Sequence, residues 1–263
     1  MNILQRLRTL SAYRHTNNRK THRHSERGNV LFYILIAVAL LAALSYAVSS
    51  TGQGGGSADI SDEKAGLAAA EILEYSNNIA SAATQLKLRG CNDTEISFDN
   101  AVSATDYSNT NAPGDNTCDI FHVSGGGLQY TEPQAEWLDS DYSAEDFYAE
   151  NLFTGTACVD FIGTGNNTCS GDGIDAADMI LIIPFIREGI CQQLNRLTGF
   201  ADASAPPPTE ADDAWGSSPA FQGAYAAPEQ ISEADNKKSG CFEGASGSRP
   251  NGGYHFYKIL LAR

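Results

Sequence analysis

The longest hydrophobic pattern in the chain lies near its start. Residues 30–48 read VLFYILIAVALLAALSYAV and contain no charged residue, glycine or proline. At about 1.5 Å per residue, a helix of this length spans roughly 28 Å, close to the hydrocarbon thickness of a bilayer. A core helix of a globular protein is rarely apolar on every side over such a length. The pattern therefore predicts a transmembrane or stalk helix over residues 29–50.

A second helical pattern follows after an interruption. Residues 51–57 read TGQGGGS, and each of the four glycines costs about 1 kcal/mol in a helix interior, so we expect a break over residues 51–60. Ser61 then offers an N-cap with acidic residues in the first turn, and Gly90 offers a stop. Between them, apolar residues recur at spacings of three and four and predict one buried face. These are Leu67, Ala68, Ile72, Tyr75, Ile79, Ala82, Ala83 and Leu86. We expect an amphipathic helix over residues 61–89 that packs on a sheet.

Beyond Gly90 the apolar runs are short. Residues 96–98, 119–123 and 253–261 are typical of strands, and the polar stretch 99–117 is typical of a loop. Residues 187–197 predict a helix. The expected fold class is α+β: the transmembrane or stalk helix, then the amphipathic helix on a small antiparallel sheet, with loops closed by disulfides.

Three further segments of this region are less regular. Residues 137–153 are acidic and aromatic and predict a short helix or a loop, and residues 205–225 predict an exposed loop or linker. Residues 179–186 read MILIIPFI and predict a core element. Pro184 within that run argues against a central strand, because proline cannot donate to a sheet ladder.

Charge divides the chain into a basic leader and an acidic body. The first 28 residues hold seven basic side chains and one acid, and the rest holds ten basic and 31 acidic side chains, a net charge of −21. Such a body argues against nucleic acid as a partner, because phosphate binding needs clustered Lys and Arg. The positive-inside rule places the leader in the cytoplasm and the body outside. The expected organisation is a leader (1–28), a membrane or stalk helix (29–50), a break (51–60) and an exported head (61–263).

All six cysteines lie in the head: Cys91, Cys118, Cys158, Cys169, Cys191 and Cys241. An even number confined to the exported side indicates disulfides formed in an oxidising compartment. A zinc site would need CxxC spacing or histidine partners, and the closest two cysteines are eleven residues apart. Six cysteines allow fifteen connectivities, which the sequence does not distinguish. Pairing in sequence order, 91–118, 158–169 and 191–241, is the most local choice.

The leader and the helix together resemble a known family. A basic leader that ends in Glu26-Arg27-Gly28 and runs directly into Asn29 and an apolar helix resembles the start of type IV pilins and type II secretion pseudopilins. The resemblance implies cleavage by a prepilin peptidase between Gly28 and Asn29 and methylation of the new N-terminus. It also implies a helix that anchors the chain in the bacterial inner membrane and later packs with other pilin-like subunits in a secretion or cell-surface filament. In that family a disulfide clamps the C-terminal sheet, and the resemblance implies Cys191–Cys241 as the candidate.

The sequence departs from that family at two positions. The first mature residue is usually Phe but is Asn29 here, and the fifth is usually Glu but is Tyr33 here. In the family that Glu pairs with a neighbour's N-terminal amine, and the large minor subunit at the filament tip lacks it. The resemblance therefore implies a minor or tip-like subunit. Two alternatives stay open: an unprocessed, single-span periplasmic or surface binding module, and a signal peptide cut near Ala42-Ala43 or Ser49-Ser50.

One loop contains the best candidate metal ligands. Residues 166–178 read NNTCSGDGIDAAD, which is rich in oxygen ligands around two glycines. The EF-hand register fails, because a glycine at its sixth position, Gly173, puts Met179 where the bidentate Glu belongs. A calcium site of another kind would use Asp172, Asp175 and Asp178, while the competing interpretation is a disulfide-closed acidic loop.

The sequence holds little that would support catalysis. It has no GxSxG, HExxH or P-loop motif, and the exported part has only His122 and His255. Carboxylate pairs such as Asp139/Asp141 and Asp212/Asp213 are typical of a solvated acidic surface. We therefore expect a structural protein and no enzyme; an anchored hydrolase that uses one of the two histidines is the remaining alternative.

Overall fold

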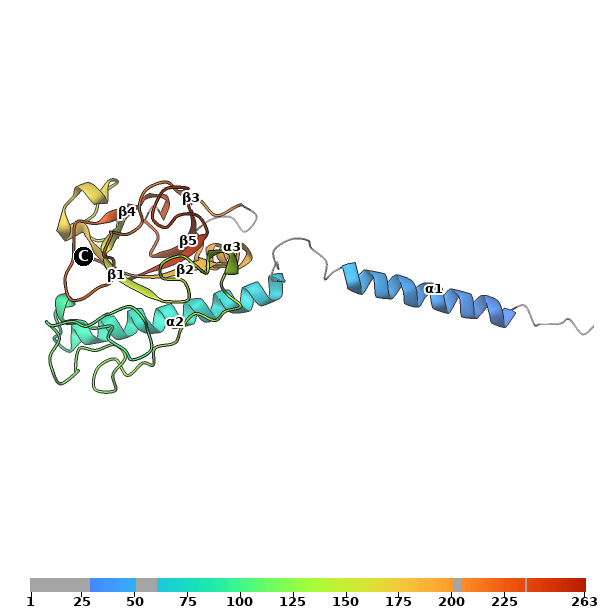
Figure 1. The fold of residues 1–263 in the computed structure, drawn as a ribbon, viewed down its shortest axis with the longest axis horizontal. Coiled ribbons are helices and arrows are strands. Elements are labelled where there is room, and N and C mark those ends of the chain that lie inside the picture. The colour runs from blue at the N-terminus through green and yellow to red at the C-terminus, as the bar shows by residue number, and fades with distance from the viewer. Residues whose placement is uncertain (1–28, 51–60, 201–204, 235) are drawn as a thin grey trace, which may run out of the picture. The chain divides into compact units, whose positions relative to one another are not determined.

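The computed structural model describes residues 29–50, 61–200, 205–234 and 236–263 (Figure 1). The chain divides into two compact units, residues 1–55 and 56–263. The leader, with Gly28, and the glycine-rich stretch 51–60 lie outside the described residues.

The first unit contains helix α1 (Asn29–Ser50), which has the bounds expected from the apolar run. Its side chains are described for residues 32–42, and every one of them is exposed. Over the described residues, no helix combines the length and the apolarity needed to cross a bilayer. The helical form of residues 29–50 is thus observed, and their membrane-spanning role stays a prediction.

The second unit begins with the long helix α2 (Asp62–Leu88). Ser61 occupies the N-cap position but its side chain makes no capping hydrogen bond, and Gly90 follows the helix with a φ of +106°. The buried face consists mainly of small residues: Ala65, Ala68, Ala69, Ile72, Ser76, Ile79, Ala82, Ala83 and Leu86. One residue of the expected face differs, since Leu67 is 67% exposed, whereas Tyr75 is partly buried and packs against the core.

The sheet has six strands in the order β3-β5-β6-β2-β1-β4. They are β1 (Leu152–Val159), β2 (Asp178–Ile186), β3 (Thr209–Glu210), β4 (Glu229–Ile231), β5 (Ser239–Gly244) and β6 (Tyr254–Leu261). The pairs β1–β4 and β3–β5 are parallel and the other pairs are antiparallel. The α+β class is confirmed, but the sheet is larger than expected and mixed.

The remaining helices are short. Helix α3 (Glu188–Thr198) follows β2 directly, close to the expected range 187–197, and Gly199 ends it with a φ of +66°. The 3-10 helices are η2 (Asp93–Glu95), η3 (Ser140–Tyr142), η4 (Cys169–Gly171), η5 (Ile174–Ala176) and η6 (Ser232–Ala234).

Strand β2 lies inside the sheet, between β6 and β1, so the expectation drawn from Pro184 was wrong. The pairing with β1 ends at Ile182, and the register with β6 shifts between Ile183 and Ile186. Pro184 falls in that irregular stretch, where it removes no regular ladder bond. The strand is buried along its whole length, because its alternate side chains enter two different core clusters. A strand covered on both faces has a continuous apolar sequence.

One core cluster joins α2 to the sheet, and α2 runs along one side of the second unit (Figure 1). Met179, Leu181 and Ile183 of β2 belong to this cluster. Ile180 and Ile182 belong to the second cluster, which includes Trp215. The predicted packing of the amphipathic helix on a sheet is therefore confirmed.

The short strands and loops expected outside the main elements agree with their predictions to different degrees. Residues 96–98 and 119–123 form a single bridge, Ser97–Asp119, and no strand of the sheet. Residues 137–151 consist of turns, η3 and a bridge from Leu138 to Ile186, in agreement with the expected short helix or loop, and residues 152–153 belong to β1. Residues 205–225 are not a uniformly exposed linker: they contain β3 and bury Ala214, Trp215 and Phe221. Their burial depends on a surface made by distant strands, which no local pattern reports.

The structure has three disulfides, Cys91–Cys118, Cys158–Cys169 and Cys191–Cys241, and no free cysteine among the described residues. This is the pairing in sequence order. Cys91–Cys118 follows the end of α2, Cys158–Cys169 closes the loop after β1, and Cys191–Cys241 joins α3 to β5.

Candidate functional site

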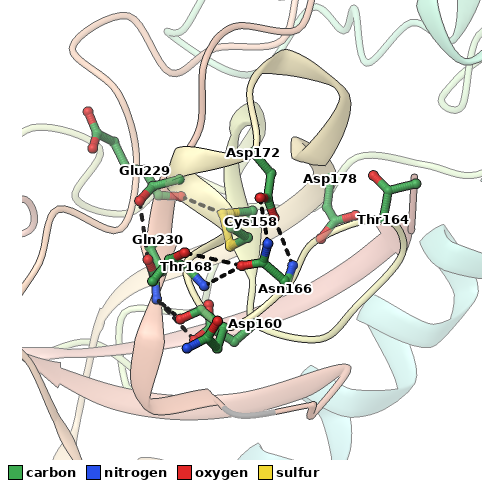
Figure 2. The surroundings of a disulfide bond; sticks show 12 residues. Cys158, Asp160, Thr164, Asn166, Thr168, Asp172, Asp178, Glu229 and Gln230 are labelled. Carbon is green, nitrogen blue, oxygen red and sulfur yellow. Dashed lines mark hydrogen bonds between the residues drawn. A yellow bond between two sulfur atoms is a disulfide. The ribbon is translucent and has the colours of Figure 1, made fainter.

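The predicted calcium loop leaves the end of β1 and returns to β2 (Figure 2). Cys158 and Cys169 close it, and both are fully buried together with Ala176. Gln230 of the neighbouring strand β4 donates from Nε2 to Oδ2 of Asp160, 3.0 Å away. The loop is therefore tied both to its own strand and to β4.

Asp172 is occupied with holding this loop. Its carboxylate accepts hydrogen bonds from the backbone N–H of Asn166 at 2.8 Å and from Nδ2 of Asn166 at 2.6 Å, and Figure 2 shows the two side chains facing each other. Oδ1 of Asn166 in turn accepts from the backbone N–H of Thr168 at 2.8 Å. Asp172 thus acts as an internal brace between two turns of the loop.

Asp175 and Asp178 do not join Asp172 in a ligand set. Asp175 enters the loop's hydrogen bonds through its backbone carbonyl, which accepts from Thr164 Oγ1 at 2.9 Å. Asp178 is fully buried, and its Oδ1 accepts from the backbone N–H of Arg263 at 3.0 Å. Burial raises the pKa of the Asp178 carboxyl to about 6, while the Arg263 contacts act in the opposite direction.

No three or more His, Cys, Asp or Glu side chains are grouped to hold a metal ion within the described ranges. The three aspartates of the calcium hypothesis therefore gain no support from the geometry. What the loop shows is the competing arrangement, an acidic loop closed by a disulfide and braced by the Asp172 carboxylate.

A cavity of about 290 Å³ lies elsewhere in the head and was not singled out by any sequence motif. Three segments distant in sequence line it, residues 145–147, residues 215–217 with Pro219, and residues 248–251, together with Phe185 of β2. Trp215 and Phe185 are each 2% exposed and close its floor. Glu145 and Asp146 are exposed on its rim.

Two of the lining residues have an unusual backbone. Phe147 has a φ of +64° and Phe185 a φ of +57°, a left-handed conformation that costs a residue with a side chain on the order of 1–3 kcal/mol. The surroundings hold Phe185 in place, since its ring stacks on that of Tyr142 with centroids 5.1 Å apart. Its backbone N–H donates to Nδ1 of the buried His255 at 3.3 Å.

His255 packs beneath the floor of the cavity, and its side chain is not accessible to a substrate. It is fully buried, its Nε2 lies 2.7 Å from the carbonyl oxygen of Gly252, and its ring has edge contacts with Phe185 and Trp215. Because Nδ1 accepts from Phe185, Nε2 carries the proton and donates to Gly252. Burial lowers the pKa of His255 to about 3, so the ring is neutral. This arrangement leaves neither nitrogen for hydrolytic chemistry.

Sequence reasoning missed the cavity because its parts carry no shared motif. The only local signals are the acidic and aromatic composition of residues 137–153 and the proline within β2, and neither indicates which segments meet. The processing site at Gly28 lies outside the described residues, and Asn29 begins α1. No protein-family model, no curated protein and no solved structure matches this chain.

Proposed function

We propose that the chain is a structural subunit of a type IV pilus or a type II secretion-like filament, in a minor or tip-like position. The observation that supports this proposal most directly is the exposure of the apolar side chains of α1. Its large apolar side chains are between 40% and 65% exposed: Phe32, Tyr33, Ile34, Leu35, Ile36, Val38, Leu40 and Leu41. A helix apolar on all sides needs a covering of lipid or of other apolar helices. A pilin-like anchor would be covered by lipid before assembly and by the apolar helices of other subunits after it.

The leader and the head support this proposal from two sides. The basic residues before Asn29 favour a cytoplasmic leader, and three disulfides favour an oxidising compartment for the head. Localisation would then be the bacterial inner membrane with an exported head, or the cell surface after assembly. The partners would be the prepilin peptidase and other pilin-like subunits, and the subunits would contact α1.

Tyr33 supports a minor or tip-like position. A carboxylate within a bundle of apolar helices is costly unless it is paired, so a subunit with no neighbour above it gains by losing that group. Tyr33 is uncharged and 63% exposed on α1. It would allow the helix to enter a bundle without a registering ion pair.

Mass spectrometry of the chain isolated from membranes tests the proposal. We expect a mature chain that begins at N-methylated Asn29. An intact Met1, or a start between Ala43 and Ser50, would overturn the filament proposal. The matched control is Gly28→Ala, which should abolish the cut, because the resemblance places a glycine immediately before the cleaved bond.

An anchored binding module is the second candidate, and the cavity in the head favours it. This module would stay unprocessed and use α1 only as a membrane anchor. An intact N-terminus together with a ligand-dependent change in the head would support it in place of the filament role.

A further inference from the structure

The cavity's rim is negatively charged and uncompensated. Glu145 and Asp146 are exposed there, and neither takes part in a salt bridge within the described residues. Arg249 also lines the cavity but is already engaged: its Nη2 lies 3.2 Å from Oδ2 of Asp213, and its Nη1 donates to the carbonyl of Trp215 at 3.1 Å. The two rim carboxylates are therefore available to a ligand.

The segment that supplies the rim extends the charge beyond the cavity. Residues 131–150 contain seven carboxylates and no Lys, Arg or His. Glu145 and Asp146 of this segment line the cavity, and Glu132, Glu136 and Asp141 are exposed elsewhere along it. Like charges at this density favour a positively charged partner.

The floor argues against ligands that need an open ring face. Trp215 and Phe185 are each only 2% exposed, so they close the cavity without presenting a stacking surface. Phe147 is the more accessible ring and is partly exposed beside Glu145 and Asp146. A cation near this ring and the two carboxylates would gain both charge-assisted hydrogen bonds and cation–π attraction.

A second copy of this chain is a poor occupant. The chain beyond the leader has a net charge of −21, so two such bodies repel each other at an acidic surface. We propose that a basic segment of a different protein binds along residues 131–150, with one Lys or Arg side chain in the cavity. The proposal holds whether or not the chain is a filament subunit.

The test is peptide binding to the whole chain in a neutral detergent, measured by calorimetry. The probe is a capped Lys-Gly-Lys-Gly-Lys peptide, compared with the same peptide carrying acetylated lysines. We expect the cationic peptide alone to bind, and the double variant Glu145→Gln/Asp146→Asn to bind about tenfold more weakly, through loss of two charge-assisted contacts.

Two further variants separate the cavity from general electrostatic attraction. Glu132→Gln/Asp141→Asn removes the same charge from the same segment outside the cavity and should change affinity less than about twofold. Ser217→Trp keeps the charge but fills the cavity from an exposed position, and it should abolish binding. Equal losses in the two charge variants, unchanged binding by Ser217→Trp, or no binding of the lysine peptide to the unaltered chain would each overturn the proposal.

Discussion

The two long helices of this chain are built for different surroundings. Helix α2 buries a stripe of small residues and Ile72 against the head's own sheet, whereas every described side chain of α1 is exposed. Helix α2 has charged residues on its outer positions, and α1 has none along its length. Helix α2 is therefore stabilised within the chain, while on the proposed function the apolar surface of α1 would be covered by lipid or by other subunits.

Placing an aspartate in each helix gives the largest expected difference in the stability of the head. Ile72→Asp places a charge in the fully buried core and should lower the unfolding free energy of the head by more than about 4 kcal/mol. Leu40→Asp, at a position 65% exposed in α1, should leave the head's unfolding within about 0.5 kcal/mol and reduce retention in membranes. Near-UV circular dichroism and membrane fractionation measure the two effects. Equal destabilisation of the head by the two variants would contradict the claim that α2, and not α1, stabilises it.

Removing a disulfide should loosen α2 and spare α1. Cys191–Cys241 joins α3, which packs against α2, to β5 and encloses 50 residues. Replacing both cysteines by alanine should cost about 4 kcal/mol, against about 3 kcal/mol for the 11-residue loop of Cys158–Cys169. Hydrogen exchange should show faster exchange for α2 amides and unchanged exchange for α1 amides. A smaller loss from the longer loop would contradict the chain-entropy reasoning.

Acidification should change the stability of the head through two buried groups, Asp178 and His255, whose effects are opposite. The pKa of Asp178 rises from 3.8 to about 6 on folding, so its contribution to stability is complete below 3.8 and is lost as the pH rises through 6. The pKa of His255 falls from 6.5 to about 3, so its contribution is complete above 6.5 and is lost as the pH falls toward 3.

Between pH 7 and pH 4 the two contributions oppose each other, each on the order of 1–3 kcal/mol. Asp178→Asn should therefore make the head lose more stability on acidification than the unaltered chain, and His255→Gln should make it lose less. Denaturant titrations at pH 4, 5, 6 and 7 measure the difference, and α1 amide exchange serves as the internal control. Parallel pH profiles for all three chains would show that neither group titrates as described.

The sequence anticipated the elements whose pattern is local. The ranges expected for α1, α2, α3 and β6 lie within about one residue of the observed bounds, because the apolar pattern of each element lies within its own segment. Pairing the cysteines in sequence order also agreed with the structure, since each bridge joins consecutive cysteines. The acidic loop after β1 was identified as a unit, although Asp172 braces the loop, Asp178 accepts from Arg263, and the aspartates do not gather as ligands.

Tertiary contacts decided the rest. Pro184 was compatible with a central strand because a register shift with β6 lies at its position, and Trp215 was buried because residues 205–225 cross a face of the sheet. The cavity needs three distant segments and a left-handed Phe185 held by His255. Hydrophobic periodicity and charge are local patterns, so they can be recognised in the sequence alone. Strand register, the closing of a cavity and the support of a strained residue depend on which distant segments meet, and only packing determines that.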